Sequence, residues 1–283
     1  MKIIKASGES AVFDESKLLR SLLRAGASES LAKELLVEIR GSLYEGVSTT
    51  EIYKKAFGLL RKKSQPSAAR YKLKKAIMEL GETGYPFEKF VGALLAAEGF
   101  STQVGVIVKG ACVSHEVDVI AEKDNRHFMC ECKFHKLQNR HCDVKIPLYI
   151  HSRFKDVEAQ WLKKPGHATK FHHGWIFTNT RFTSDATEYA ACAGMQLISW
   201  DYPEGNAIRD RVDRTGIHPI TCLTTLTPAE KKVLIEKDII TVKNLYENSS
   251  WLTEIGVKSL RLKKVTEEIS QLRNSDLSKQ INV

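Results

Sequence analysis

Two short segments rich in β-forming residues constrain the fold of this chain more than any other part of its sequence. They cover residues 116–120 and 130–133, and the polar residues 123–126 between them favour a turn. The pair therefore predicts a β-hairpin. Apolar side chains accompany the charged ones throughout, namely Val117, Val119, Ile120, Phe128 and Met129. We expect the hairpin to lie mostly inside the protein.

The charged side chains of this hairpin can meet on one face. Because side chains alternate between the two faces of a strand, Glu131 and Lys133 project from one face and Cys130 and Cys132 from the other. Asp118, on the first strand, can share the face of Glu131 and Lys133. Mg²⁺ is usually held by one or two carboxylates with water and phosphate, and a nearby lysine can orient water or offset phosphate charge. This combination indicates a metal-dependent phosphodiesterase.

Two other interpretations of the same residues stay open at this point. Charged residues at alternate strand positions often form only a solvated face, although burying them without a purpose would be unfavourable. A group of cysteine and histidine residues could bind Zn²⁺, and its members are Cys130, Cys132, His135, His141 and Cys142. The spacing lacks the second pair of a zinc finger, so Cys130 and Cys132 are more simply explained as small buried residues.

Length and composition favour a globular protein of two or three domains. The 283 residues are 42% apolar, no apolar run approaches the roughly 20 residues of a membrane helix, and the first residues do not resemble a signal peptide. The six cysteines are scattered rather than arranged as a disulfide framework, which indicates a reducing compartment. We expect a cytoplasmic protein without a membrane partner.

The positive charge is concentrated at the start of the chain. The net charge is +9, and residues 1–84 contain 16 Lys and Arg against 10 Asp and Glu. Residues 85–222 contain 17 against 16. A basic segment suits a polyanion, either nucleic acid or a nucleotide triphosphate.

Residues 1–82 are expected to form a first domain, in which a hairpin around Gly8 precedes four amphipathic helices. Asp14 offers an N-cap for the first helix. The fourth helix is predicted at 68–80, after Pro66.

This pattern resembles the ATP-cone, a small nucleotide-binding regulatory domain. The matching motifs are Ile4-Lys5-x-x-Gly8, Phe13-Asp14-x-x-Lys17-Leu18, Val47-Ser48-Thr49-Thr50-Glu51-Ile52 and Ala69-Arg70-Tyr71-x-Leu73. The resemblance implies ATP or dATP as ligand, with Lys5 and Lys17 on the phosphates and Thr49 and Arg70 near the nucleotide. One departure is Ala6, which stands where the family usually has arginine. Because no Gly-rich phosphate loop is present, nucleotide binding is expected rather than hydrolysis.

Residues 83–205 are expected to form a mixed α/β sandwich. A turn at Gly84 and Pro86 starts a helix that Gly99 ends. The further elements are a strand at 102–108, the hairpin, a basic helical stretch at 153–164, a strand at 174–179, a helix at 184–193 and a strand at 195–200. This order of helices and strands is typical of two packed layers.

The second unit resembles the Mrr-type restriction endonuclease domain of the PD-(D/E)xK nuclease superfamily. The ordered motifs are Phe87-Glu88-x-Phe90-Val91, Gly99-Phe100, Val117-Asp118-Val119-Ile120-Ala121, Glu131-Cys132-Lys133 and Phe177-Thr178-Asn179-x-x-Phe182-Thr183-x-x-Ala186. The resemblance implies that Asp118, Glu131 and the backbone carbonyl of Cys132 hold Mg²⁺ or Mn²⁺. It also implies Lys133 as the third catalytic residue and Glu88 as an accessory acid. Glu131 stands where many members of the group carry glutamine.

The remaining chain is less informative. Residues 206–222 are expected to be a linker, and residues 223–283 a small helical domain similar to those that carry helix-hairpin-helix elements. Plain helical packing or dimerisation is an alternative for that domain. Arg153, Lys163 and Lys164 could lie near a DNA backbone, although a charged helix face is often only solvated.

The sequence thus predicts an α+β multidomain protein, with a mainly helical ATP-cone, an α/β restriction-endonuclease-like core with a mixed sheet, and a small helical C-terminal module. The expected function is Mg²⁺-dependent endonucleolytic cleavage of double-stranded DNA in restriction or defence. ATP or dATP is expected to shift a homo-oligomeric state and thereby control cutting. The alternatives are a repair or RNA nuclease of the same fold, and a non-catalytic DNA-binding regulator that responds to nucleotide.

Overall fold

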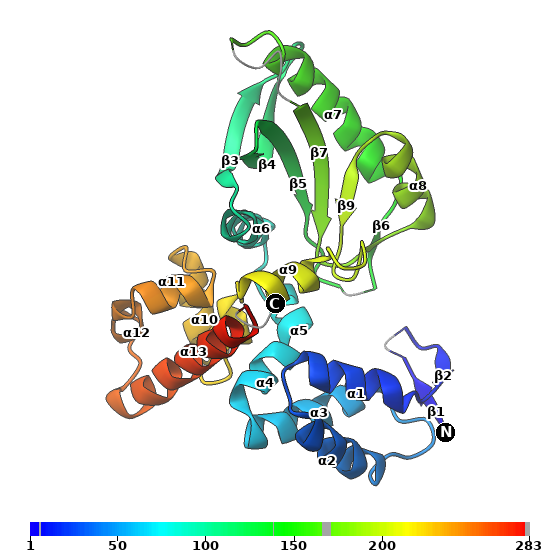
Figure 1. Ribbon diagram of the computed structural model, residues 1–283, viewed down its shortest axis with the longest axis vertical. Coiled ribbons are helices and arrows are strands. Elements are labelled where there is room, and N and C mark those ends of the chain that lie inside the picture. The colour runs from blue at the N-terminus through cyan, green and yellow to red at the C-terminus, as the bar shows by residue number, and fades with distance from the viewer. Residues whose placement is uncertain (6, 138, 166–170, 281–283) are drawn as a thin grey trace.

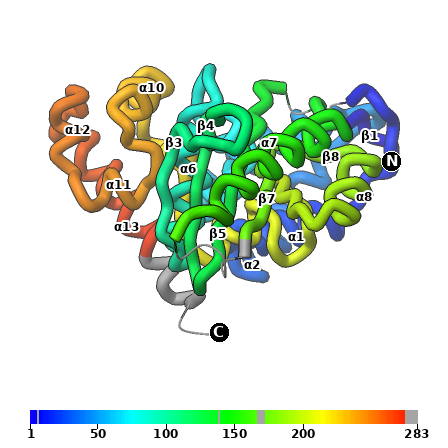
Figure 2. Tube along the Cα trace, turned by 90° about the horizontal axis from the view of Figure 1, so that it is seen from above, coloured from blue at the N-terminus to red at the C-terminus, as the bar shows by residue number. Residues whose placement is uncertain are grey.

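The structure is a computed structural model that describes residues 1–5, 7–137, 139–165 and 171–280. It has a largely helical N-terminal region, a central five-stranded sheet flanked by helices, and a helical C-terminal region, as Figure 1 shows. The predicted fold class is therefore confirmed. Seen from above, the N-terminal hairpin and the last helices lie at opposite ends of the molecule (Figure 2).

The N-terminal region begins with the predicted hairpin. Strand β1 (Lys2–Ile4) pairs antiparallel with β2 (Ser10–Val12), and Gly8 between them adopts a φ of 85°, a conformation that favours glycine. Five helices follow, which are α1 (Glu15–Arg24), α2 (Glu29–Arg40), α3 (Thr49–Lys63), α4 (Gln65–Tyr71) and α5 (Leu73–Met78). Asp14 caps α1 as predicted, because its carboxylate accepts hydrogen bonds from the backbone N–H groups of Ser16 and Lys17.

The single fourth helix predicted at 68–80 is wrong, because two short helices occupy this segment. Helix α4 begins earlier, at Gln65, and has Pro66 in its first turn. The chain then turns at Lys72 before α5 starts. Residues of this segment pack into two cores. Ala68 packs into the N-terminal core, whereas Ile77 packs into the core beneath the sheet.

The central sheet has the strand order β3-β4-β5-β7-β9. These strands are β3 (Ser101–Lys109), β4 (Ser114–Lys123), β5 (Arg126–Lys133), β7 (Phe171–Thr178) and β9 (Gln196–Ile198). The first three are antiparallel, and β5, β7 and β9 are parallel. The hairpin turn is the predicted one: Asp124 and Asn125 have φ values of 50° and 57°, as a two-residue turn of a twisted hairpin requires.

Helices cover both faces of this sheet (Figure 1). Helix α6 (Tyr85–Ala97) packs on one face, while α7 (Lys145–Trp161) and α8 (Ser184–Cys192) pack on the other. A small separate ladder joins β6 (His141–Cys142) to β8 (Arg181–Phe182).

The segment at 206–222, expected to be a linker, is an ordered part of the fold. It contains helix α9 (Ile208–Thr215) and the short helix η1 (Ile220–Cys222). Its apolar side chains are fully buried at Ile208 and Val212. Four helices complete the chain, which are α10 (Pro228–Glu236), α11 (Val242–Glu247), α12 (Ser250–Glu254) and α13 (Ser259–Gln280).

The apolar side chains form two main cores. The N-terminal core extends from Ile3 to Ala68 and draws on β1 and the first four helices. A larger core extends from Ala69 to Leu272 and joins α5, α6, one face of the sheet, α9 and the C-terminal helices. Within the described residues, no helix has the length and apolar character needed to cross a bilayer.

Candidate active site

The centre of the candidate site is the point where β4 and β5 separate. The pairing of these strands ends at Val119 and Cys130, so Asp118 and Glu131 lie directly beyond the last pair. There the carboxylate of Asp118 accepts a hydrogen bond of 2.7 Å from the backbone N–H of Cys132. Asp118 is half-buried, and this bond fixes its side chain against β5. The hairpin therefore brings the two predicted carboxylates to one place.

Glu131 is held by two cations. Its side chain is 4% exposed, and its two oxygens lie 2.5 Å from Lys133 Nζ and 2.8 Å from Arg153 Nη1. Arg153 projects from α7 and also donates to the backbone carbonyl of Glu116. A buried carboxylate needs such partners, because an unpaired buried charge is strongly unfavourable.

Arg153 is the residue of this site that sequence reasoning missed. The sequence suggested that it could contact a DNA backbone, whereas the structure places its guanidinium on Glu131. Its place on a basic helical stretch gave no local signal of this role. Only the packing of α7 against the sheet shows it.

Burial and neighbouring carboxylates raise the pKa of Asp118 and of Glu88. Burial, followed by the charge of Glu131, raises the pKa of Asp118 to about 6. On α6, burial followed by the charges of Asp118, Glu116 and Glu131 raises the pKa of Glu88 to about 7. The predicted accessory acid therefore lies within electrostatic reach of the other two. Clustered negative charge of this kind favours a bound cation.

The donor set fits a hard divalent cation better than zinc. Asp118 and Glu131 offer carboxylate oxygens and Cys132 offers a backbone carbonyl, which are ligand types that Mg²⁺ accepts together with water. In the described part of the chain, no three or more His, Cys, Asp or Glu side chains are arranged to hold one metal ion. A structural zinc site needs four such ligands, whereas a Mg²⁺ held by two carboxylates would complete its coordination with the Cys132 carbonyl, water and phosphate. Burial also raises the pKa of the Cys130 and Cys132 thiols, which disfavours the thiolate that zinc needs. The structure does not support the zinc alternative.

The segment after Lys133 is fixed by the end of β7. Lys133 lies opposite Thr178 in the parallel pairing, and the Thr178 hydroxyl donates to the Lys133 carbonyl at 2.8 Å. Asn179, which is 2% exposed, accepts from the N–H of His135 and donates to its carbonyl, both at 2.8 Å. The Phe177-Thr178-Asn179 motif therefore positions the strand end that carries Lys133.

Three of the residues expected at the nucleotide site are Lys5, Lys17 and Thr49, and a β-bridge between Ile4 and Ser48 joins the segments that carry Lys5 and Thr49. Lys5 and Lys17 are exposed, and each has an acidic neighbour, Glu9 at 2.9 Å and Asp14 at 3.7 Å. Thr49 is the first residue of α3 and is half-buried. Their contact with ATP or dATP stays a prediction.

Arg70, the fourth residue, is placed differently. It is 8% exposed, lies against the turn at Gly26 and donates to the backbone carbonyl of Leu272 on α13 at 3.3 Å. The structure thus places Arg70 where the N-terminal region meets the last helix. Its proposed contact with nucleotide also stays a prediction.

Three known domain families match consecutive parts of this chain. An ATP cone domain matches residues 1–76, a restriction endonuclease domain of the Mrr catalytic type matches residues 81–202, and an AF1548-like C-terminal domain matches residues 218–273. The first two matches confirm both resemblances read from the sequence. A nuclease-type domain is thus joined to a nucleotide-binding type of domain in one chain.

One relative and one solved structure cover most of this chain. An uncharacterized protein of Archaeoglobus fulgidus is 35% identical over 188 residues, which are 63% of this chain and 97% of that protein. The crystal structure of the protein of unknown function AF1548 superposes with a TM-score of 0.55 and 33% sequence identity. That match covers 67% of this chain and 98% of the solved one.

Proposed function

Because this chain belongs to the family of AF1548-like proteins and carries an ATP cone domain ahead of a restriction endonuclease domain, we propose that it is a metal-dependent DNA endonuclease controlled by ATP or dATP. A role in DNA restriction or defence is part of this proposal. The observation that carries it is the arrangement of Asp118, Glu131 and Lys133 around one point of the sheet, with Glu88 within electrostatic reach.

Each residue of the site has a chemical role in this proposal. Asp118, Glu131 and the Cys132 carbonyl would hold Mg²⁺ or Mn²⁺, which when bound supplies a Lewis acid for the phosphate and a more acidic water. Lys133 is the more exposed partner of Glu131, so its ammonium can orient the attacking water or offset charge on the phosphate. Glu88, with a pKa of about 7, can hold or release a proton near neutral pH.

Cleavage of plasmid DNA tests the proposal directly. We expect purified protein to cut double-stranded DNA with Mg²⁺ or Mn²⁺ and not with EDTA. Asp118→Ala and Lys133→Ala should abolish cutting, while Lys136→Ala, at an exposed position three residues after Lys133, should leave it unchanged. Far-UV circular dichroism checks folding. Equal cutting by the folded Asp118 and Lys133 variants would refute the assignment.

Two further experiments distinguish this proposal from its alternatives. Competition with RNA of the same sequence distinguishes a DNA nuclease from an RNA nuclease of the same fold. Tight DNA binding without cutting in either metal would favour a non-catalytic regulator.

The nucleotide part of the proposal assigns ATP or dATP to Lys5, Lys17, Thr49 and Arg70 and expects a change in a homo-oligomer. Light scattering with and without nucleotide measures the change in mass. An unchanged mass and unchanged cutting at saturating ATP would contradict this part alone.

A further inference from the structure

Helix α9 lies at the centre of the molecule, where the three regions of the chain meet (Figure 1). It carries alternating acidic and basic residues, Asp210, Arg211, Asp213 and Arg214. A sequence of this kind resembles a solvated linker, yet Arg211 is only 3% exposed. These four side chains form ion pairs with two different regions of the chain.

The two acidic residues of α9 bind the ATP cone. Arg24, in the last turn of α1, donates from Nε to Asp213 at 2.9 Å, and its Nη2 lies 2.8 Å from the same carboxylate. Arg24 also pairs with Asp210. Since Asp210 and Asp213 are three residues apart, both lie on the same side of α9. One arginine of the cone thus holds two successive positions of that helix.

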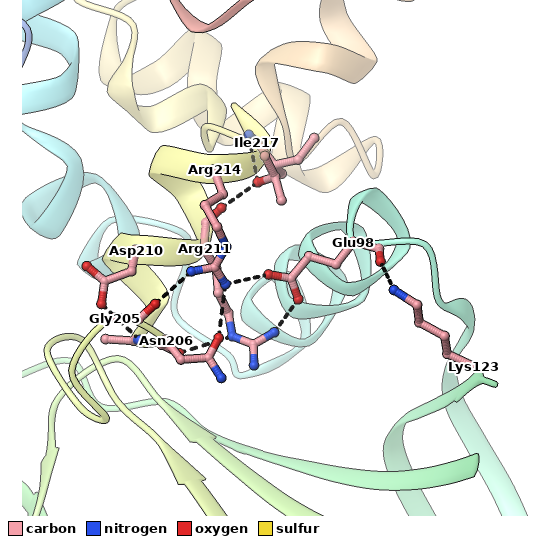
Figure 3. Close-up of polar contacts among 10 residues, drawn as sticks. Glu98, Lys123, Gly205, Asn206, Asp210, Arg211, Arg214 and Ile217 are labelled. Carbon is pink, nitrogen blue, oxygen red and sulfur yellow. Dashed lines mark hydrogen bonds and ion pairs between the residues drawn. The ribbon is translucent and has the colours of Figure 1, made fainter. Parts of the chain in front are cut away.

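Two of the three basic residues of α9, Arg211 and Arg214, bind the restriction endonuclease domain. Glu98, which follows the last residue of α6, pairs with Arg211 and lies 3.0 Å from Arg214 Nη2, as Figure 3 shows. The Arg211 guanidinium also lies over the ring of Trp175 on β7, 5.3 Å from its centroid. Lys123 at the end of β4 donates to the Glu98 carbonyl at 2.7 Å. The end of α6 is therefore anchored to α9 and to the sheet.

Helix α6 connects this anchor to the candidate active site. Glu88 stands in the first turn of α6 and Glu98 follows its last turn. At about 1.5 Å per residue, the two positions are about 15 Å apart along one helix. Because a hydrogen-bonded helix moves as a unit, displacement of α9 at Glu98 would also shift Glu88 relative to Asp118.

We infer that α9 transmits nucleotide occupancy from the cone to the candidate active site through these two sets of ion pairs. Arg24 and Glu98 are positioning residues in this scheme. Arg24 holds α9 in place relative to the cone, and Glu98 links α9 to the end of α6, so that α6 moves with α9. A nucleotide can bias the site in this way only if it binds two arrangements of the cone with different affinity. The inference rests on the proposed function for its activity readout.

The test is a double-mutant cycle with Arg24→Gln and Asp213→Asn on the full chain. Neither residue belongs to the proposed catalytic set or the proposed nucleotide contacts. In the wild type, ATP should change the cleavage rate at least about 5-fold, in the range typical of allosteric coupling. Arg24→Gln should bring this ratio close to 1 with ATP affinity unchanged by calorimetry, whereas Asp213→Asn, which keeps the pair of Arg24 with Asp210, should lower it less. The double variant should do no more than Arg24→Gln alone, since Arg24→Gln already removes the contact with Asp213.

A second readout does not depend on cutting. Hydrogen exchange of backbone amides in α6 should change when ATP is added to the wild type, and this change should disappear in Arg24→Gln and in Glu98→Gln. Arg20→Gln, at an exposed position of the same helix α1, is the matched control and should behave as the wild type.

The outcomes separate the inference from the proposed function. If the wild type does not cut DNA but ATP alters exchange in α6 only when Arg24 is present, the coupling stands and the nuclease assignment fails. If the wild type cuts and Arg24→Gln keeps the full ATP effect on rate and exchange, the coupling is overturned. An α6 that does not respond to ATP in the wild type overturns it as well.

Discussion

Arg153 on α7 and Glu131 on β5 form an ion pair of 2.8 Å between side chains that are 13% and 4% exposed. The pair connects the helix on one face of the sheet to the strand that carries the candidate catalytic residues. Since Lys133 binds the other oxygen of Glu131, this carboxylate is held from both sides. The orientation of Glu131 is therefore fixed before any ligand arrives.

Removing Arg153 should weaken both the fold and the site. In Arg153→Met, Glu131 keeps only Lys133, and the loss of a charge-assisted bond to a buried group should lower the free energy of unfolding by about 2 kcal/mol. Cleavage should slow because Glu131 can rotate. Urea denaturation and initial rates measure the two effects. Lys155→Met, at an exposed position of the same helix, should change neither.

The raised pKa values of Asp118 and Glu88 predict the pH dependence of the metal-free protein. A carboxyl whose pKa is higher in the folded than in the unfolded chain binds protons more tightly when folded, so stability falls as pH rises through that interval. The interval runs from the ordinary values of 3.8 and 4.5 to about 6 and about 7. Without metal, Tm should therefore fall between about pH 4 and about pH 7.

Mg²⁺ should reverse this loss, because a cation stabilises the ionised carboxylates that it binds. Thermal unfolding with and without Mg²⁺ should show a larger rise in Tm at pH 8 than at pH 5. Asp118→Asn should reduce both the pH slope and the effect of Mg²⁺. An equal Mg²⁺ effect at the two pH values, or in the variant, would contradict the assignment.

The hydrogen bonds of Glu268, far from the candidate active site, should contribute strongly to the free energy of unfolding. This carboxylate on α13 is fully buried and accepts four hydrogen bonds of 2.6–3.0 Å from the backbone and hydroxyl groups of Thr224 and Thr225. Glu268→Ala should lower the free energy of unfolding by about 3 kcal/mol, because it leaves buried donors without an acceptor. Chemical denaturation measures this, and the exposed neighbour substitution Glu267→Ala should cost little.

A substitution of Asn179 should change the cleavage rate because Asn179 holds the segment after β5 in place. Asn179→Asp keeps the size of the side chain and can still accept from the His135 N–H, but it cannot donate to the His135 carbonyl. We expect a lower kcat with little change in KM, since the substitution removes support only from the end of β5, which carries Lys133. A change confined to KM would place Asn179 in substrate binding instead.

Much of the fold could be predicted from local sequence signals. Gly8, the cap at Asp14 and the turn at Asp124 and Asn125 each depend on residues close in the chain, so short patterns identify them. The hairpin also allowed Asp118, Glu131 and Lys133 to be placed together, because strand alternation and one turn determine their face.

The features that were missed depend on contacts between distant residues. The position of Arg153 at Glu131 requires α7 to pack on β5, which no local pattern specifies. The charges of α9 suggested a solvated linker because their partners, Arg24 and Glu98, lie more than 100 residues earlier in the chain. The division of residues 65–78 between two cores likewise depends on distant partners. Periodicity alone cannot show any of these.

The core from Ala69 to Leu272 determines which parts of the protein unfold together. Because the sheet and the C-terminal helices share that core, the restriction endonuclease domain and residues 223–272 should melt together, and a truncation that removes α13 should leave neither part folded. The core from Ile3 to Ala68 is separate and should give its own calorimetric transition. Residues up to Ala68 should therefore unfold as one unit, and residues from Ala69 to Leu272, which include the last part of the ATP cone, should unfold as another.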